Sequence, residues 1–170
     1  MNLNKSAQLE EFREIVRTYG GYVYTITYRM LGNAADAEDA AQETFIKVFR
    51  KLSKYNEAYE MKTWLGAIAV NTARDFFRKN RHGKLFGTEE EIDQNVCDNE
   101  ETTRIQHQLD VTKMLSCLDI RQRSVVILFY MEQCSIKEIS TMLKKSENLI
   151  KVWLHRARKT LARQYGESAV

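Results

Sequence analysis

The pattern of apolar and polar positions indicates helices along most of this chain. Between residues 9 and 19, apolar side chains recur three and four positions apart, as they do on one face of an α-helix. Gly20 and Gly21 are expected to interrupt this helix. Residues 22–31 fit two patterns, because their apolar positions match both an alternating strand and a helical face. Gly32-Asn33 ends the segment.

Two longer stretches predict helices more strongly, at residues 34–53 and at about 62–81, with a short polar connector between them. The first has acidic residues in its opening turns and lysines and arginines at its end, which suits the helix dipole. Its alanines, phenylalanines and Val48 form one apolar stripe, as expected of a helix that packs against a core.

The periodicity stops after residue 82. The segment that follows has two glycines, many acidic residues and little periodicity, which is typical of a linker. We therefore expect an N-terminal domain at 1–82, a flexible acidic linker at 83–105 and a C-terminal domain at 106–170. The net charge is unevenly spread: about +3 over residues 1–81, −5 over residues 82–105 and +5 over the remainder. Basic ends around an acidic middle suggest contact with a polyanion.

The C-terminal domain carries a signature of paired helices. Apolar positions near 105–115 and 125–130 predict two helices, and Ser135 and Glu138 form a capping box before a short helix at about 136–143. A brief turn leads to Ser146, which is able to cap a last helix at about 147–164. A short helix, a tight turn and a longer basic helix match the proportions of a helix-turn-helix.

Composition narrows the fold class and the chemistry. The 170 residues include no proline and 7 glycines, which favours an all-α protein of two small helical domains: a three- to four-helix bundle and a helix-turn-helix. There is no apolar run long enough to span a bilayer and no apolar signal core, so we expect a cytoplasmic protein without direct membrane insertion. The three cysteines form no CxxC pair. We expect no metal, no cofactor and no catalytic residue.

Two basic segments suggest contact with nucleic acid. On the last helix, Lys151, His155 and Arg158 fall on a face away from the apolar stripe, where a helix in the major groove would present them to bases and phosphates. The other segment is the end of the 62–81 helix, where aromatic residues alternate with cations. That arrangement suits stacking on unpaired bases, although a packed core with a basic end fits the same residues.

The chain also resembles a known family. In the N-terminal half the matching residues are Asp36, Glu38, Asp39, Gln42, Glu43, Phe45, Trp64, Leu65, Ile68, Ala69, Asn71 and Asp75. In the C-terminal half they run from Leu118 to Leu161 and include Tyr130, Ser135, Glu138, Ser146, Lys151, Arg156 and Arg158. These segments resemble the second and fourth conserved regions of extracytoplasmic-function (ECF) sigma factors, in the right order and with a variable linker between them.

The resemblance implies a role for each set of residues. Those expected to bind core RNA polymerase are Asp36, Glu38, Asp39, Gln42 and Glu43. Those expected to bind the melted upstream promoter element are Asn56, Lys62, Trp64, Asn71, Arg74, Arg78 and Lys79. Those expected to bind the distal promoter element are Ser146, Asn148, Lys151, Val152, His155, Arg156 and Arg158. Many members of the family are inhibited by an anti-sigma factor, often one bound to the membrane, so we expect such a partner beside the polymerase and promoter DNA.

Other interpretations stay open at this point. A stand-alone helix-turn-helix regulator would explain the C-terminal half, but not the acidic start of the 34–53 helix. A nucleic-acid enzyme would need a nucleophile motif, a metal cluster or a phosphate-binding loop, and the sequence has none. The chain also departs from the family pattern: Lys144 occupies a turn position where glycine is common. Trp153 occupies a recognition-helix position and is compatible with a core, a DNA-facing or a partner-facing role.

Overall fold

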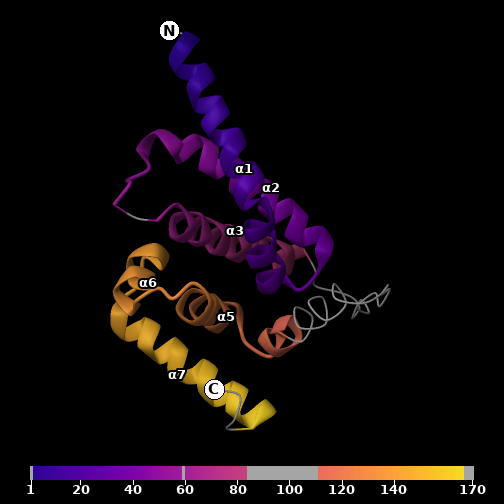
Figure 1. The fold of residues 1–170 in the computed structure, drawn as a ribbon. Coiled ribbons are helices and arrows are strands. Elements are labelled where there is room, and N and C mark those ends of the chain that lie inside the picture. The colour runs from indigo at the N-terminus through magenta and orange to yellow at the C-terminus, as the bar shows by residue number, and fades with distance from the viewer. Residues whose placement is uncertain (1, 59, 84–110, 167–170) are drawn as a thin grey trace, which may run out of the picture.

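The computed structural model describes residues 2–58, 60–83 and 111–166, and within these ranges the chain forms helices and no strand (Figure 1). Residues 84–105 of the expected linker therefore lie outside the described residues. The N-terminal elements are α1 (Asn2–Leu31), α2 (Ala34–Lys51), a 3₁₀ turn at Leu52–Lys54 and α3 (Met61–Gly83). The C-terminal elements are a helix at 111–116, α5 (Ile120–Val126), a π-helical turn (Ile127–Met131), α6 (Ile136–Leu143) and α7 (Glu147–Tyr165). None of the described helices is both long and apolar enough to cross a membrane.

The prediction that Gly20 and Gly21 interrupt the first helix was wrong, because α1 continues through both to Leu31. Residues 22–31, which fitted two patterns, are helical. A glycine inside a helix costs roughly 0.5–1 kcal/mol relative to alanine. Buried apolar side chains on both sides of the pair, including Ile15 and Val23, bind α1 to the rest of the domain and offset that cost.

Helices α1, α2 and α3 pack on one another and form the core of the N-terminal domain. Small side chains on the inner face of α2, such as Ala37 and Ala40, are fully buried, so the backbones are able to approach closely. Gly32 turns the chain with φ of 81°, a conformation open to glycine. Asn33 then caps α2 by accepting a hydrogen bond of 2.8 Å from the backbone N–H of Asp36.

The C-terminal domain confirms the predicted caps. The Ser135–Glu138 capping box is formed in both directions at the start of α6, and Ser146 accepts from the backbone N–H of Leu149 at the start of α7. The predicted α6 bounds match, and α7 ends one residue beyond the predicted 164. The helix predicted near 125–130 begins earlier, at Ile120, because Asp119 caps it with hydrogen bonds of 2.8 and 2.9 Å. It ends in the π-helical turn.

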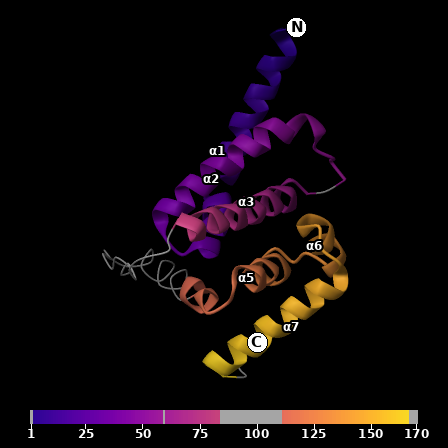
Figure 2. The same cartoon turned by 180° about the vertical axis from the view of Figure 1, so that it is seen from behind.

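The two domains lie against each other in two layers (Figures 1 and 2). Helix α3 lies between α1 and α2 on one side and α5 and α6 on the other, while α7 lies on the far side of the C-terminal layer. The N-terminal end of α1 projects beyond the other helices. The α3–α5, α3–α6 and α1–α5 contacts join the domains directly. Nothing in the sequence predicted these contacts.

Candidate nucleic-acid and polymerase interface

Helix α2 presents the residues predicted to bind polymerase along its outer side. Glu38, Asp39 and Gln42 are exposed, and Glu43 is partly exposed beside Lys47 at 3.9 Å. Asp36 has the same intermediate exposure as Glu43 and accepts a hydrogen bond of 3.0 Å from the side chain of Asn33. The structure therefore leaves three of the five predicted residues exposed and two partly exposed.

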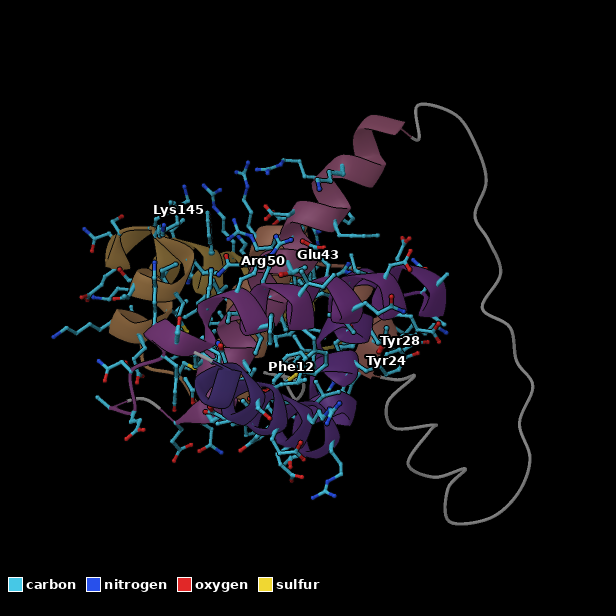
Figure 3. The ribbon with its side chains drawn as sticks, turned by 90° about the horizontal axis from the view of Figure 1, so that it is seen from above. Phe12, Tyr24, Tyr28, Glu43, Arg50 and Lys145 are labelled. Carbon is cyan, nitrogen blue, oxygen red and sulfur yellow. The ribbon has the colours of Figure 1, made fainter. Side chains whose placement is uncertain are left out.

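The same surface of α2 continues into apolar side chains that sequence reasoning missed. Ile46 is 45% exposed and Phe49 is 37% exposed, and the Phe49 ring meets that of Phe12 on α1 edge-on at 5.0 Å. Figure 3 shows Phe12 on α1 and Glu43 and Arg50 on α2. Ile46 follows Gln42 by four residues on a helix, and this spacing was the signal that could have extended the predicted surface.

The residues predicted to hold melted DNA separate into two groups. Trp64, Asn71 and Arg78 follow one another at seven-residue spacing, and Arg74 lies between them, so the four share one side of α3. Lys62 lies on the opposite side, with its Nζ 3.9 Å from Glu132 and 5.0 Å from the centre of the Tyr22 ring. Asn56 lies in the preceding turn, where its side chain accepts from the backbone N–H of Ala58.

The shared side of α3 faces the C-terminal domain. Trp64, Ile68 and Asn71 line a cleft of about 570 Å³ whose opposite wall includes Met142 of α6. The side-chain amide of Asn71 donates to the backbone oxygen of Met142 at 3.0 Å and to that of Ala67 at 2.9 Å. Both N–H groups of this amide are therefore engaged, one of them by the other domain.

A second cleft, of about 1050 Å³, lies further along α3 and is basic. It is lined by Arg74 and Arg78 of α3, by Arg121 of α5 and by Lys145 of the α6–α7 turn. Burial lowers the pKa of Arg74, and the charges of Arg121 and Arg78 act in the same direction, while Asp75 opposes them. Asp75 is shared, because it accepts from Arg78 at 3.1 Å and lies 3.8 Å from Lys47. The packing of the two domains thus places cations from both of them in one cleft.

Helix α7 presents its predicted residues to solvent. Asn148, Lys151, His155 and Arg156 are exposed, and Val152 is 41% exposed. The side chain of Arg158 contacts Tyr130: its Nε donates to the Tyr130 hydroxyl at 2.6 Å, and its guanidinium lies 5.7 Å from the centre of that ring.

Trp153 is 6% exposed and belongs to the core of the C-terminal domain. Its place among the buried side chains decides between the three interpretations that the sequence left open. Ser146 also has a structural role, since its hydroxyl caps α7. The remaining exposed residues form one continuous surface on the first half of the helix.

The comparisons with known proteins agree with this geometry. Family models for "Sigma-70 region 2" and "Sigma-70, region 4" match residues 15–83 and 108–161. Among curated proteins, the chain is 28% identical to the ECF RNA polymerase sigma factor SigW of Bacillus subtilis, over 94% of this chain and 91% of SigW. It is 31% identical to the ECF RNA polymerase sigma factor SigX of the same organism, over 89% of this chain and 82% of SigX.

A solved structure shares the fold. The sigma factor RpoE in complex with the anti-sigma factor NepR, from Bartonella quintana, superposes with a TM-score of 0.65 at 19% identity, over 91% of this chain and 96% of that one. The structural similarity shows a shared fold, whereas the family models and the 31% identity to SigX identify the family. They show that this chain belongs to the ECF sigma factors, a family that is not a class of enzymes.

Proposed function

We propose that this sigma factor binds core RNA polymerase through α2, melted promoter DNA through α3 and the distal promoter element through α7. The observation that carries this proposal is the exposed basic surface at the start of α7, held on a capped helix-turn-helix. A stand-alone regulator would need that surface alone. The exposed acidic side of α2 in the same chain favours a protein that also docks on a large partner.

The α2 surface suits a polar docking contact. Glu38, Asp39 and Gln42 are exposed, so their carboxylates and amide can reach a partner. Ile46 and Phe49 would add apolar contact next to them. Acidic groups in a polar rim set partner choice and association rate more than affinity, while the apolar pair would contribute to affinity on burial.

The α3 side suits an unpaired strand. Trp64 offers an aromatic face beside Tyr55, whose ring lies 4.8 Å away, and Asn71, Arg74, Arg78 and Lys79 follow it along the helix. Extruding a base costs a few kcal/mol, which stacking and hydrogen bonds in a pocket offset. The cations would hold the phosphates that follow.

The α7 surface suits the major groove of duplex DNA. The distal element that it would read lies about one to two helical turns of DNA upstream of the melted element. Lys151 and Arg156 are exposed on its first half. Replacing either with alanine is expected to weaken use of the distal element by about 1–3 kcal/mol if it contacts a base. Arg163→Ala, two turns beyond Arg156 on the same helix, is the matched control. Unchanged promoter preference in both variants would contradict the assignment.

Regulation and organisation complete the proposal. We place the domain boundaries near residues 82 and 106, as the sequence predicted, and the protein in the cytoplasm with the polymerase. We also propose an anti-sigma factor as a partner. The solved relative RpoE is bound to one, and the clefts between α3 and helices α5 and α6 give such a partner a surface that spans both domains.

The test is run-off transcription. The purified chain is added to bacterial core polymerase free of other sigma factors, with a template that carries the promoter upstream of its own gene. A discrete transcript that requires this chain is the expected result. Tight, specific duplex binding by the free chain, with neither core binding nor a transcript, would support the stand-alone regulator instead.

A further inference from the structure

The cleft of about 570 Å³ between α3 and α6 has an apolar floor. Trp64, Ala67 and Ile68 of α3 line one side of it, and Met142 of α6 belongs to the other. The volume lies within the range of about 300–1000 Å³ that is usual for sites that bind small organic molecules. An apolar group that displaces water from these side chains gains free energy in proportion to the area it covers.

Lysines from both domains line the same cleft. They are Lys47 and Lys51 of α2, Lys137 of α6 and Lys144, which ends α6. The last three are exposed, and within the part of the chain that the structure describes none of these three forms an ion pair. Lys47 differs, because its Nζ lies 3.9 Å from Glu43 and 3.8 Å from Asp75.

The two carboxylates that line the cleft are already engaged elsewhere. Asp75 lies 3.8 Å from Lys47 and accepts a hydrogen bond from Arg78. Glu138 accepts from the backbone N–H and the hydroxyl of Ser135 in the capping box. The cleft therefore combines an apolar floor with ammonium groups on both of its sides. The molecule complementary to it has an apolar body and an anionic end.

We propose that this cleft binds an amphiphilic anion, a small organic molecule with an apolar body and one carboxylate. The apolar body lies on Trp64 and Met142, and the carboxylate meets the lysines at the edge, such as Lys51 and Lys137. A bare phosphate does not fit as well, because it has nothing to cover the apolar floor. The inference goes beyond the proposed function and does not rest on it, since it requires only the residues of the cleft.

The two parts of such a ligand have different roles. Burial of the apolar body supplies most of the affinity. Ion pairs with exposed lysines contribute little each, so the lysines mainly decide which sign of charge the cleft accepts. A molecule with the same apolar body and a cationic end is therefore expected to bind more weakly, and this preference distinguishes the site from a merely apolar surface.

Binding is measured on the full chain by isothermal titration calorimetry. The probe is dodecanoate, kept below the concentration at which it forms micelles. Dodecyltrimethylammonium, which has the same alkyl chain and the opposite charge, is the comparison. We expect dodecanoate to bind saturably, with one molecule per chain, and about tenfold more tightly than the cation.

The variant that tests the lysines combines Lys51→Glu and Lys137→Glu, one from each side of the cleft. We expect it to weaken dodecanoate binding about tenfold and to strengthen binding of the cation. The matched control combines Lys113→Glu and Lys159→Glu, which are exposed outside the cleft and change the net charge equally. If the double variant does not fold, Lys137→Glu alone replaces it, because an acidic residue in the first turn of α6 suits the helix dipole.

Fluorescence checks where the alkyl chain lies. Bromine quenches tryptophan on contact, so a brominated dodecanoate should quench Trp64, which lines the cleft, and spare Trp153, which is buried in the core of the C-terminal domain. Trp64→Phe should remove the quenching. Four results would overturn the inference: no saturable binding, equal affinity for the two head groups, equal affinity in the cleft and control variants, or quenching that survives Trp64→Phe.

Discussion

Helices α3 and α7 both carry cations and both are proposed to contact DNA, yet their proposed DNA contacts differ in exposure to solvent. Along α7 the proposed contacts, such as Lys151 and Arg156, face solvent. Along α3 the corresponding side faces another domain, and Asn71 is hydrogen bonded to it. The basic surface of α7 is thus open to solvent, whereas on α3 Trp64, Asn71 and Arg74 line clefts between the domains and only Arg78 and Lys79 are exposed among the proposed contacts that follow Trp64.

The difference follows from what each surface would bind. A major groove exists in any duplex, so a surface that reads it needs no gate, and its weak contacts with other DNA are brief. An unpaired strand exists only where DNA is melted. A surface for stacking bases has little sequence preference, and in this structure Trp64 and Asn71 line a cleft between the two domains.

The largest expected effect is on the free energy of unfolding, and it distinguishes two neighbouring residues of α7. Trp153 is buried and Val152 is exposed, so the first supports the surface and the second belongs to it. Trp153→Ala is expected to lower the free energy of unfolding by about 3–5 kcal/mol, through the cavity it leaves. Val152→Ala is expected to leave stability within about 0.5 kcal/mol of the original. Denaturant unfolding measures both, and equal losses would contradict the assignment of Trp153 to the core.

A second effect would sharpen the contrast between α3 and α7. Trp64→Ala is expected to weaken single-strand binding by about 1–3 kcal/mol for each stacked base. We expect this loss in the polymerase complex and a smaller change in the free protein, where Trp64 lines the cleft between the domains. Permanganate reactivity of unpaired thymines at the promoter measures the first, and oligonucleotide titration measures the second. Equal losses in both states would break the comparison.

The capping box that positions the helix-turn-helix gives a smaller effect with a defined pH dependence. Ser135→Ala is expected to cost about 1 kcal/mol. The Ser135 side chain and backbone N–H both donate to Glu138, which lowers the pKa of that carboxyl below its ordinary value. The resulting stabilisation is present above the ordinary glutamate pKa, about 4.3, and is lost as the pH falls through the lowered pKa.

This dependence is checked by unfolding the chain between pH 3 and pH 6, a range that brackets the ordinary glutamate pKa of about 4.3. Glu138→Gln removes the titrating group, so the part of the pH dependence that belongs to this carboxyl should disappear. A variant with an unaltered pH profile would show that the capping box contributes no such term.

The smallest effect is a gain in stability. Lys144 ends α6 in the left-handed conformation, with φ of 52°, and a residue with a side chain pays about 1–2 kcal/mol there. Glycine avoids this strain but loses about 0.5–1 kcal/mol through the greater freedom of the unfolded chain. Lys144→Gly should therefore stabilise the protein by about 0.5–1 kcal/mol in thermal unfolding. A loss of stability would indicate that the lysine side chain makes a contact of its own.

Local patterns carried much of the fold. The capping residues Ser135 and Ser146 predicted where α6 and α7 begin, because a cap depends on side chains within three residues of the helix start. Gly20 and Gly21 misled the same kind of reasoning. The burial of Ile15 and Val23 against other helices outweighed the local preference of the glycines, and a local pattern does not contain that energy.

For the candidate surfaces, too, local sequence patterns predicted some features and tertiary packing decided others. Helical periodicity alone was sufficient to place Lys151 and His155 away from the apolar side of α7. Only the tertiary structure decided that Trp153 is buried, that Arg158 contacts Tyr130, and that one side of α3 faces the C-terminal domain. The contact of Glu132 with Tyr22 and that of Arg123 with the backbone oxygen of Met30 had no signal in the sequence. More than 90 residues separate the two partners in each contact. Sequence spacing fixes which side of a helix a residue occupies, whereas the packing of distant segments decides what that side meets.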